Sequence, residues 1–283
     1  MAEPYDVIII GGGAAGENLA GRTSPGGLST VIVESELVGG ECSYWACMPS
    51  KALLRPAEVL AQARRGPAAA DAVTGTVDVE KTLQSRDAFA NQYDDYGQAK
   101  WVESIEADLI RGQARLAGPR RVSVETADGV RELTAAKAVV LATGSRTAVP
   151  PIPGIEDVGA WSSRDIVTAK AVPESIIVLG MGPVGAEMAQ AWRSLGSEVT
   201  VIDQAQADGF PNIEPFAVEA LVKQMEEDGI RVLLGASVEA VSRQGATVTV
   251  RLASGAQITG SELILATGRV PATDDAGLET VGL

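Results

Sequence analysis

The sequence predicts an α/β protein with two three-layer domains, each built on a parallel sheet and carrying a small antiparallel meander. Two observations lead to this prediction. A buried strand followed by a glycine-rich turn and a helix occurs twice, with turns at 11–16 and 180–185. Each copy also has a later strand that ends in Ala-Thr-Gly, at 142–144 and at 266–268. This repeat indicates an internal duplication, and 283 residues suffice for two domains with full cores.

The first copy begins with residues 5–10, an apolar run typical of a buried parallel strand. A turn of the form G-x-G-x-x-G follows. In this turn Gly11 permits the tight bend, Gly13 lets the backbone approach a pyrophosphate, and Gly16 allows the helix to pack closely on the strand. The helix itself is predicted over 14–22.

The start of this helix and the next strand together predict a dinucleotide site. Free N–H groups and the helix dipole favour an anion at the N-terminus of helix 14–22. Strand 30–34 ends in Glu34, close to the ~20-residue offset at which an acid binds an adenosine ribose. A glycine-rich turn alone is a weak signal, but strand, helix, second strand and acid in this order indicate a bound dinucleotide.

Both cysteines of the protein lie in the segment 39–51, soon after strand 30–34. Four residues separate Cys42 from Cys47, and Lys51 follows one helical turn later. Two thiols beside a bound nucleotide cofactor can exchange electrons with it. We expect a helix over 47–60, whose N-terminus, with the nearby lysine, should stabilise the thiolates. The alternative is a static disulfide or two buried thiols.

The rest of the first domain, 1–149, is predicted as helices followed by short strands. The expected elements are helix 51–65, a helical stretch 79–106, a meander of strands 108–111, 113–117, 121–126 and 131–134, and a parallel strand 137–142. Pro150-Pro151-Ile152-Pro153-Gly154 forms a stiff linker.

The second domain, 150–268, repeats the first pattern. We expect strand 175–180, helix 184–195, strand 198–202 ending before Asp203, helix 214–228, strand 230–234 and a meander at 237–260. Residues 269–283 should cross back toward the first domain.

Composition limits the classes of function. Hydrophobic residues make up 46% and charged residues 21%, as in ordinary globular domains. The net charge of −14 argues against nucleic-acid or anionic-membrane partners. No apolar run is long enough to span a membrane, the first strand leaves no room for a signal peptide, and we expect a cytoplasmic protein. Without histidine there is neither a Ser-His-Asp hydrolase nor a complete zinc site, so no metal site is expected.

The chain resembles the pyridine nucleotide–disulfide oxidoreductases, on the lipoamide dehydrogenase and mercuric reductase side. Six motifs carry the resemblance: G-G-G-A-A-G at 11–16, Cys-x4-Cys-x-P-S-K at 42–51, A-T-G-S at 142–145, P-P-I-P-G at 150–154, G-M-G-P-V-G-A-E at 180–187 and A-T-G-R at 266–269. The resemblance implies that the first Rossmann-like domain binds FAD, the second binds NAD(P)H, and the cysteine pair is a redox-active disulfide against the flavin.

The resemblance also assigns roles to single residues. Cys47 would face the flavin as the charge-transfer thiolate, and Cys42 would attack an outside disulfide. Lys51 matches the family lysine near flavin N5, with Glu187 as its ion-pair partner; the alternative is two surface charges. Further cofactor contacts are expected at Ala14, Ala15, Ser35, Gly40, Glu41, Ala114, Thr143, Gly144, Ser145, Gly180, Gly182, Pro183, Val184, Gly185, Val238 and Gly268. Of these, Val238 and Gly268 are equally compatible with plain strand and turn residues.

The residues after the second strand of the second copy favour NADH. Asp203 can accept a hydrogen bond from the ribose 2′-hydroxyl, whereas a 2′-phosphate needs Arg or Lys nearby. Residues 204–208 contain no cation, so NADPH is the less favoured cofactor. A capping or loop role is the alternative for Asp203.

Some features depart from the family pattern. Family chains are homodimeric and continue past Leu283 with a second FAD segment and a dimerisation domain that carries a catalytic His–Glu pair. Glu41 replaces the usual Thr, Ser43-Tyr44-Trp45-Ala46 replaces a Leu-Asn-Val-Gly-like run, and Pro183 takes the place of an aromatic gate. We therefore expect weak or no turnover from these 283 residues.

The predicted function is electron transfer from NAD(P)H through FAD and the Cys42–Cys47 disulfide to a disulfide or metal ion. The alternatives are an NADH oxidase or diaphorase that reduces oxygen or a quinone, and a truncated nucleotide-binding fragment without turnover.

Overall fold

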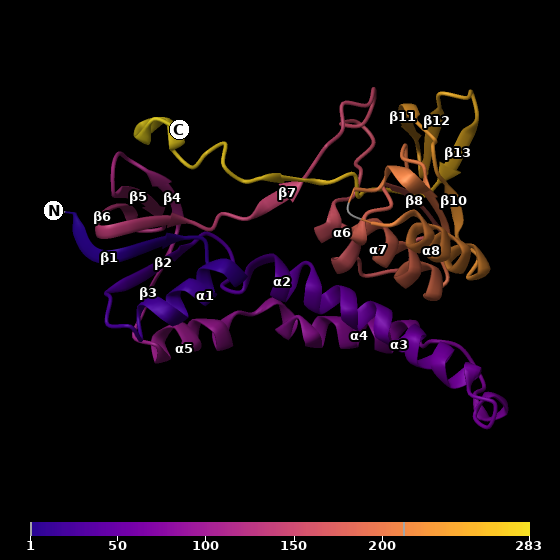
Figure 1. Ribbon diagram of the computed structural model, residues 1–283, viewed down its shortest axis with the longest axis horizontal. Helices are drawn as coiled ribbons and strands as arrows, with labels where there is room; N and C mark the ends of the chain where they lie inside the picture. Colours follow the sequence, from indigo (N-terminus) through magenta and orange to yellow (C-terminus); the bar gives the residue numbers. More distant parts are fainter. Residues whose placement is uncertain (1, 212) are drawn as a thin grey trace. The chain divides into compact units, whose positions relative to one another are not determined.

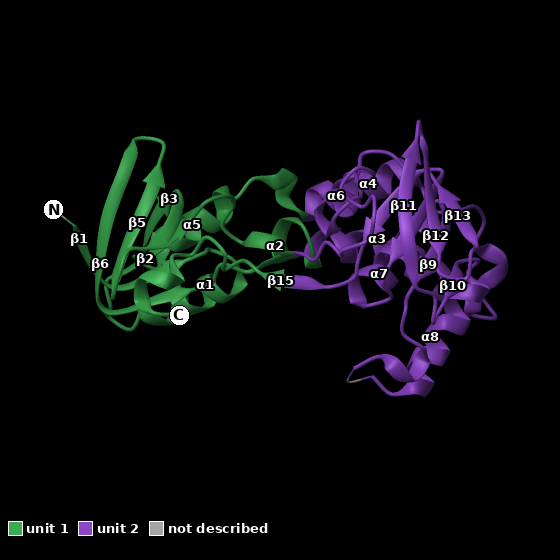
Figure 2. Ribbon diagram, turned by 90° about the horizontal axis from the view of Figure 1, so that it is seen from above, with its two compact units in different colours: residues 1–47, 90–146, 270–283 green, residues 48–89, 147–269 purple. Residues whose placement is uncertain are grey.

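A computed structural model describes residues 2–211 and 213–283, which form two compact units. Unit 1 comprises Met1–Cys47, Ala90–Arg146 and Val270–Leu283, and unit 2 comprises Met48–Phe89 and Thr147–Arg269 (Figure 2). Residues 48–89 thus group with the second half of the chain, although the sequence suggested a first domain over 1–149. The functional domain boundaries stay a prediction.

Unit 1 is built on a six-stranded sheet in the order β3-β2-β1-β6-β5-β4 (Figure 1). The strands are β1 (Glu3–Ile10), β2 (Thr30–Glu34), β3 (Asp108–Arg111), β4 (Gln113–Leu116), β5 (Arg121–Thr126) and β6 (Gly129–Leu141). The neighbouring strands β3, β2, β1 and β6 pair in parallel, whereas β5 pairs antiparallel with both β6 and β4.

One strand of unit 1 is longer than predicted. The sequence suggested separate strands at 131–134 and 137–142, but β6 continues through both. Residues 129–134 of β6 pair with β5 and residues 133–141 with β1, so Leu133 and Thr134 pair on both sides. Because Ala135 and Ala136 keep an extended backbone between the two predicted strands, the meander extends the parallel sheet instead of forming a layer of its own.

Apolar side chains on both faces of the unit 1 sheet are buried. Ile8 and Ile10 of β1 join one cluster with the meander, while Val7 and Ile9 join another with Ala20. Burial on both faces is what the apolar run at 5–10 predicted for a parallel strand. Helices α1 (Ala14–Thr23) and α5 (Tyr96–Ser104) contact each other, and α2 (Gly40–Tyr44) is a short helix.

Unit 2 contains a four-stranded parallel sheet in the order β10-β9-β8-β14. Its strands are β8 (Ser175–Leu179), β9 (Glu198–Ile202), β10 (Arg231–Leu233) and β14 (Glu262–Leu265), and the separate meander consists of β11 (Val238–Gln244), β12 (Thr247–Leu252) and β13 (Gln257–Gly260). Its helices are α3 (Cys47–Arg65, from Met48 on), α4 (Val79–Phe89), α6 (Ser163–Thr168), α7 (Pro183–Ser194) and α8 (Pro215–Glu227).

Two apolar clusters cover the faces of the unit 2 sheet. Ile176 and Val178 pack with the fully buried Trp192 of α7, and Leu53 of α3 joins this cluster. Ile177 and Leu179 pack with the meander on the other face. These contacts explain why residues 48–89 belong to unit 2. Helices, sheet and meander form the three layers that the sequence predicted.

The remaining elements are short. A two-stranded ribbon pairs β7 (Ser145–Thr147) with β15 (Arg269–Pro271), and 3₁₀ turns lie at η1 (Ala70–Ala72), η2 (Asn91–Tyr93), η3 (Ala207–Gly209) and η4 (Leu278–Val281). Leu278 and Val281 pack on the unit 1 core. Among the described residues, no helix is long and apolar enough to cross a membrane.

Candidate functional site

The first glycine-rich turn requires glycine because of close backbone contacts. Gly11 has φ +106°, and a Cβ there would lie 2.2 Å from the Ala142 carbonyl oxygen. A Cβ on Gly16 would lie 2.0 Å from the Gly11 carbonyl oxygen, so the helix can approach the strand only without side chains. The turn thus places the N-terminus of α1 at the carboxyl end of β1, as the motif predicted.

The second turn has the same construction. Gly180 has φ +101°, and its Cβ would lie 2.3 Å from the Ala266 carbonyl oxygen. A Cβ on Gly185 would lie 1.9 Å from the Gly180 carbonyl oxygen. The paired Ala-Thr-Gly strands seen in the sequence are therefore the strands against which the two turns pack.

Each copy has one acid at the end of its second strand, Glu34 in the first and Asp203 in the second, and the two make equivalent contacts. Glu34 accepts hydrogen bonds from the Gly12 and Glu36 backbone N–H groups, at 2.6 and 2.7 Å. Asp203 accepts from the Met181 and Ala205 N–H groups, at 2.7 and 2.8 Å. Each carboxylate is held by backbone on both oxygens and keeps lone pairs for further donors.

These features fit the two nucleotide cofactors implied by the resemblance. Both helices begin at a glycine N-cap, Gly13 or Gly182, without a side-chain cap, so their first N–H groups are available to a phosphate. A Cβ on Gly182 would meet nothing within 4 Å, which leaves open space for a ligand at the start of α7. A fixed acid lies near each turn to receive ribose hydroxyls.

The cysteine segment is anchored to the first turn by backbone contacts. Gly39, with φ +110°, donates its N–H to the Gly12 carbonyl at 2.8 Å and forms a parallel bridge with Gly13. A Cβ on Gly40 would lie 2.8 Å from the Gly13 Cα. The chain then enters α2, which carries Cys42. The predicted proximity of the cysteines to the nucleotide turn therefore follows from glycines on both sides.

Cys42 lies next to Cys47, which begins α3. The Cys42 thiol is half-buried and hydrogen-bonds the Cys47 side chain, whereas Cys47 is exposed. This hydrogen bond, burial, and the charges of Cys47 and Glu17 raise the pKa of Cys42 to about 11. The expectation of a stabilised thiolate is thus wrong for Cys42. A hydrogen bond from the Cys47 backbone N–H lowers the pKa of Cys42, but the Cys47 thiol, burial and the charge of Glu17 together raise it by more. The redox role of the pair stays a prediction.

The predicted pairing of Lys51 with Glu187 is present within unit 2. Lys51 Nζ on α3 lies 2.6 Å from Glu187 Oε1 on α7. The buried Ser50 hydroxyl donates to Glu187 Oε2 at 3.2 Å and accepts from Lys51 Nζ at 3.4 Å. The sequence analysis missed Ser50, although it stands inside the Pro-Ser-Lys motif that was used for the resemblance. The catalytic role of the ion pair stays a prediction.

The other predicted contacts lie in plain structural positions. Ala114 is buried on β4, and Val238 begins β11. Gly144 (φ +72°) and Gly268 (φ +140°) follow β6 and β14 with open space at their Cα atoms. Ala14, Ala15 and Pro183 lie exposed in the first turns of α1 and α7, whereas Val184 is half-buried. These positions are compatible with ligand contact, and their cofactor roles stay predictions.

Comparisons with known proteins agree with this geometry. The sequence model of the pyridine nucleotide-disulphide oxidoreductase family matches residues 5–283. The chain is 30% identical to a mercuric reductase from Staphylococcus aureus, over 99% of this chain and 51% of the relative. It is 34% identical to dihydrolipoyl dehydrogenase 3 from Pseudomonas aeruginosa, over 100% of this chain and 62% of the relative.

Solved structures give the same picture. The Cu(II) complex of the HOCl-induced flavoprotein disulfide reductase RclA from Escherichia coli is similar with a TM-score of 0.86 at 27% identity, over 100% of this chain and 60% of that one. LpdA from Mycobacterium tuberculosis gives a TM-score of 0.83 at 26% identity, over 100% of this chain and 62% of that one. The chain thus spans between about half and three fifths of the length of these proteins.

Proposed function

The chain belongs to the pyridine nucleotide-disulphide oxidoreductase family, and we propose that it passes electrons from NADH through FAD to a Cys42–Cys47 disulfide and on to an acceptor. FAD and a nicotinamide nucleotide are the cofactors of this family. The observation that carries the proposal is the hydrogen-bonded cysteine pair, held beside a nucleotide-binding turn through Gly39.

The residues that would hold each cofactor follow from the two turns. The α1 N-terminus would bind the FAD pyrophosphate, with Glu34 accepting from its adenosine ribose. The α7 N-terminus would bind the pyrophosphate of NADH, with Asp203 on the ribose. An Asp at this position repels a 2′-phosphate, and residues 204–208 provide no cation, which supports NADH over NADPH.

When bound, FAD supplies the relay that takes two electrons from the nicotinamide and delivers them to the cysteine disulfide. The chain's own residues do the rest. Cys42, once deprotonated, attacks one sulfur of an acceptor disulfide, whose S–S bond breaks to release a thiolate. The Cys47 thiolate then attacks Cys42, which re-forms their disulfide and releases the second acceptor sulfur. Two electrons leave the pair in each cycle.

The Lys51–Glu187 pair would position a cation beside the reacting ring. Glu187 and Ser50 fix the direction of the ammonium group. A positive charge held in this way stabilises negative charge that develops on a neighbouring ring during hydride transfer. The resemblance to the family lysine near flavin N5 supports this assignment.

The test is whether NADH reduces the pair. Oxidised protein is reconstituted with FAD under anaerobic conditions, treated with NADH, alkylated and analysed by mass spectrometry. We expect both Cys42 and Cys47 to become alkylated after NADH and neither to be alkylated without it. A pair that stays oxidised while NADH is consumed would overturn the proposal and favour an oxidase or diaphorase.

A metal ion is the second candidate acceptor. It is supported by the 30% identity to a mercuric reductase and by the similarity to a flavoprotein disulfide reductase solved as a Cu(II) complex. Thiolates bind such soft metal ions well. With NADH and FAD present, oxidation of one NADH for each Hg(II) lost, continuing beyond one Hg(II) per protein and requiring both cysteines, would support this acceptor. Loss that persists in a Cys42→Ser variant would exclude it.

A further inference from the structure

Val38 fixes the segment that leads into the cysteines. Its backbone N–H donates to Asp95 Oδ2 at 2.6 Å, and its carbonyl accepts from the Tyr44 hydroxyl at 3.0 Å. Val38 and Tyr44 are both fully buried. Because Val38 lies just before α2 and Tyr44 ends it, both ends of the helix that carries Cys42 are tied to this one residue.

Helix α2 depends on such ties. It spans five residues, which are too few to hold a helix in place by its own hydrogen bonds. Its start is also held by the Gly39 N–H on the Gly12 carbonyl at 2.8 Å. The position of the Cys42 thiol therefore follows from the contacts around α2, and the contact with Asp95 comes from farthest along the chain.

Asp95 is the N-cap residue of α5, where an aspartate usually accepts from an N–H group of its own helix. Among the described residues, its carboxylate caps none of the N–H groups of α5. It turns instead to Val38 and to Arg111, whose Nη2 lies 2.6 Å from the same Oδ2 atom. Arg111 Nη1 also donates to the Glu36 carbonyl at 2.9 Å. The ion pair thus holds residues 36–38 at both ends.

The turn before Asp95 is strained. Its three residues have positive φ, at +49°, +54° and +60°: Asn91, Gln92 and Tyr93. Consecutive residues other than glycine keep such a left-handed backbone only where other contacts hold them. Asp94 supplies two of these contacts, because its carbonyl accepts from the Asn91 amide at 2.5 Å and its carboxylate from the Tyr96 N–H at 2.7 Å. Asp94 thus serves the start of α5, and Asp95 is left for Val38.

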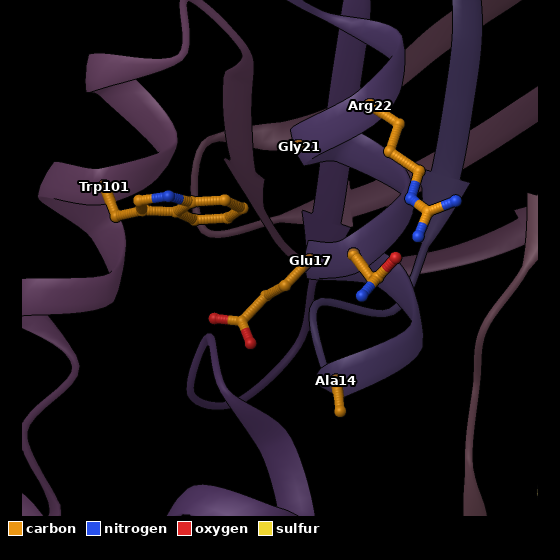
Figure 3. A pocket seen from close by; sticks show the side chains of 6 residues that line it. Ala14, Glu17, Gly21, Arg22 and Trp101 are labelled. Atoms are coloured by element: carbon orange, nitrogen blue, oxygen red, sulfur yellow. The ribbon is translucent and has the colours of Figure 1, made fainter.

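Helix α5 is itself fixed on α1. The Trp101 ring of α5 lies against Gly21 of α1, where a Cβ would be 3.2 Å from the ring (Figure 3). Together with Glu17 and Arg22, these two residues line a pocket of about 460 Å³. Because α5 packs on α1 in this way, a firmly placed helix presents Asp95 to Val38.

We propose that Asp95 is a positioning residue for the cysteine pair: through Val38 it fixes α2, and with it the Cys42 thiol, relative to Cys47, and so favours formation of their disulfide. The inference rests on the proposed function, in which this disulfide is reduced and re-formed. Asp95 acts through Val38 and does not take part in the chemistry.

The consequence is a shift in a thiol–disulfide equilibrium. When an outside disulfide oxidises the pair, a bond forms between the two cysteine sulfurs, and two electrons and two protons pass to the outside disulfide, which opens to two thiols. The equilibrium constant depends on the effective concentration of one cysteine thiol at the other. A loosened α2 lowers this concentration and favours the dithiol. A loss of stability that is equal in the reduced and oxidised protein leaves the constant unchanged.

The test measures this constant in the full chain before FAD or NADH is added. The protein is equilibrated with mixtures of reduced and oxidised dithiothreitol, quenched with acid, alkylated and analysed by mass spectrometry. We expect the constant for disulfide formation to fall about fivefold in Asp95→Ala. It should fall less in Asp95→Asn, whose amide oxygen still accepts from Val38 but carries no charge for Arg111. Asp95→Asn keeps the shape of the side chain, so the test does not depend on the folding of Asp95→Ala.

Glu3→Ala is the matched control. Glu3 forms an ion pair with Arg131 at 2.6 Å in the same sheet, and it begins β1, at the other end of that strand from Gly11. We expect this variant to unfold more easily but to keep the constant of the parent. Unchanged constants in both Asp95 variants, or an equal fall in Glu3→Ala, would overturn the proposal.

A second comparison tests the route through Val38. Tyr44→Phe removes the other tie on Val38 and should also lower the constant. In the Tyr44→Phe background, Asp95→Ala should lower it by less than in the parent, because the two side chains act through the same residue. Equal falls in both backgrounds would show that the ties act independently and would overturn this route.

These outcomes are separate from those of the proposed function. If the Asp95 variants shift the equilibrium but NADH never reduces the cysteine pair, the electron path fails while the role of Asp95 stands. If NADH reduces the pair but the Asp95 variants match the parent, the electron path stands and the role of Asp95 is refuted.

Discussion

The two glycine-rich turns share one backbone construction but differ in what surrounds them. In each, a glycine at positive φ lies against the carbonyl of an Ala-Thr-Gly strand, and an acid binds the turn through two backbone amides. Helix α1 buries only Gly16 and Ala20, whereas α7 buries six residues, including Trp192. The second strand of the first copy leads into the cysteine segment, and that of the second copy leads into η3.

This difference shows how one scaffold can serve two tasks. In both copies the turn and its acid are the residues that we propose to bind a nucleotide. The thinly covered α1 leaves room for a pocket and for the cysteine pair, while the well-covered α7 provides only Glu187 to pair with Lys51. Under the proposed function, the cysteine pair that reacts with the acceptor therefore lies outside the duplicated part.

The largest effects should come from substitutions of the first glycine in each of the two turns. We expect Gly11→Ala and Gly180→Ala each to lower the free energy of unfolding by more than ~2 kcal/mol, because a Cβ would meet a carbonyl oxygen at positive φ. FAD retention should fall only in Gly11→Ala, and NADH binding only in Gly180→Ala.

Chemical denaturation and equilibrium binding of both nucleotides provide the measurements. For the free energy of unfolding alone, Gly182→Ala is the matched control, since its Cβ would meet no atom of the protein within 4 Å and its φ is ordinary. If Gly180→Ala lost FAD and kept NADH, the assignment of cofactors to the two turns would be reversed.

Substituting the acids should have the next largest effect. Loss of a charge-assisted hydrogen bond is worth about 1.5–3 kcal/mol, so we expect at least ~10-fold weaker FAD binding in Glu34→Gln and ~10-fold weaker NADH binding in Asp203→Asn. The NADH-to-NADPH preference, from titrations of both nucleotides, should narrow only in Asp203→Asn. An unchanged preference would show that Asp203 does not select the cofactor.

The Lys51–Glu187 pair should affect chemistry more than stability. Its side chains are 62% and 34% exposed, and such pairs contribute at most ~1 kcal/mol. We expect Glu187→Gln to shift the melting temperature by only a few degrees, but to slow flavin reduction by NADH about tenfold in rapid mixing. The control is Lys81→Met, which removes a surface ion pair with Asp78 and should leave the rate of flavin reduction unchanged. A normal rate in Glu187→Gln would leave the pair only a structural role.

The smallest effect concerns pH. The folded-state pKa of Cys42, about 11, lies above its ordinary value of 9.0, so the folded protein holds this proton more tightly than the unfolded chain. The stabilisation is complete below about pH 9 and is lost as pH rises to about 11. Denaturation at a series of pH values should show this loss in the parent and a weaker one in Cys42→Ser. Identical pH profiles would contradict the raised pKa.

Sequence periodicity and motifs predicted most of the fold, because buried strands and glycine turns leave strong local signals. The places where prediction failed depend on contacts between distant segments. Nothing local shows that β6 continues through Ala135 and Ala136, or that residues 48–89 pack against α7. The Lys51–Glu187 pair was predicted through the family resemblance alone, since the two residues are 136 positions apart.

The state of Cys42 shows the same limit. Spacing suggested a shared helix N-terminus, but only Cys47 begins α3, and Cys42 faces a thiol and the charge of Glu17. The pocket was also not predicted, because it arises where Trp101 of α5 packs on Gly21 of α1. A glycine at position 21, mid-helix where a larger residue is usual, was the available signal.

An anaerobic NADH titration of the FAD-reconstituted protein tests the central claim most directly. If the cysteine pair and the flavin form one electron path, the oxidised protein takes up two equivalents of NADH, because disulfide and flavin accept two electrons each, while a Cys42→Ser, Cys47→Ser double variant takes up one. Uptake of one equivalent by both proteins would show that the cysteines lie outside the path and would contradict the account.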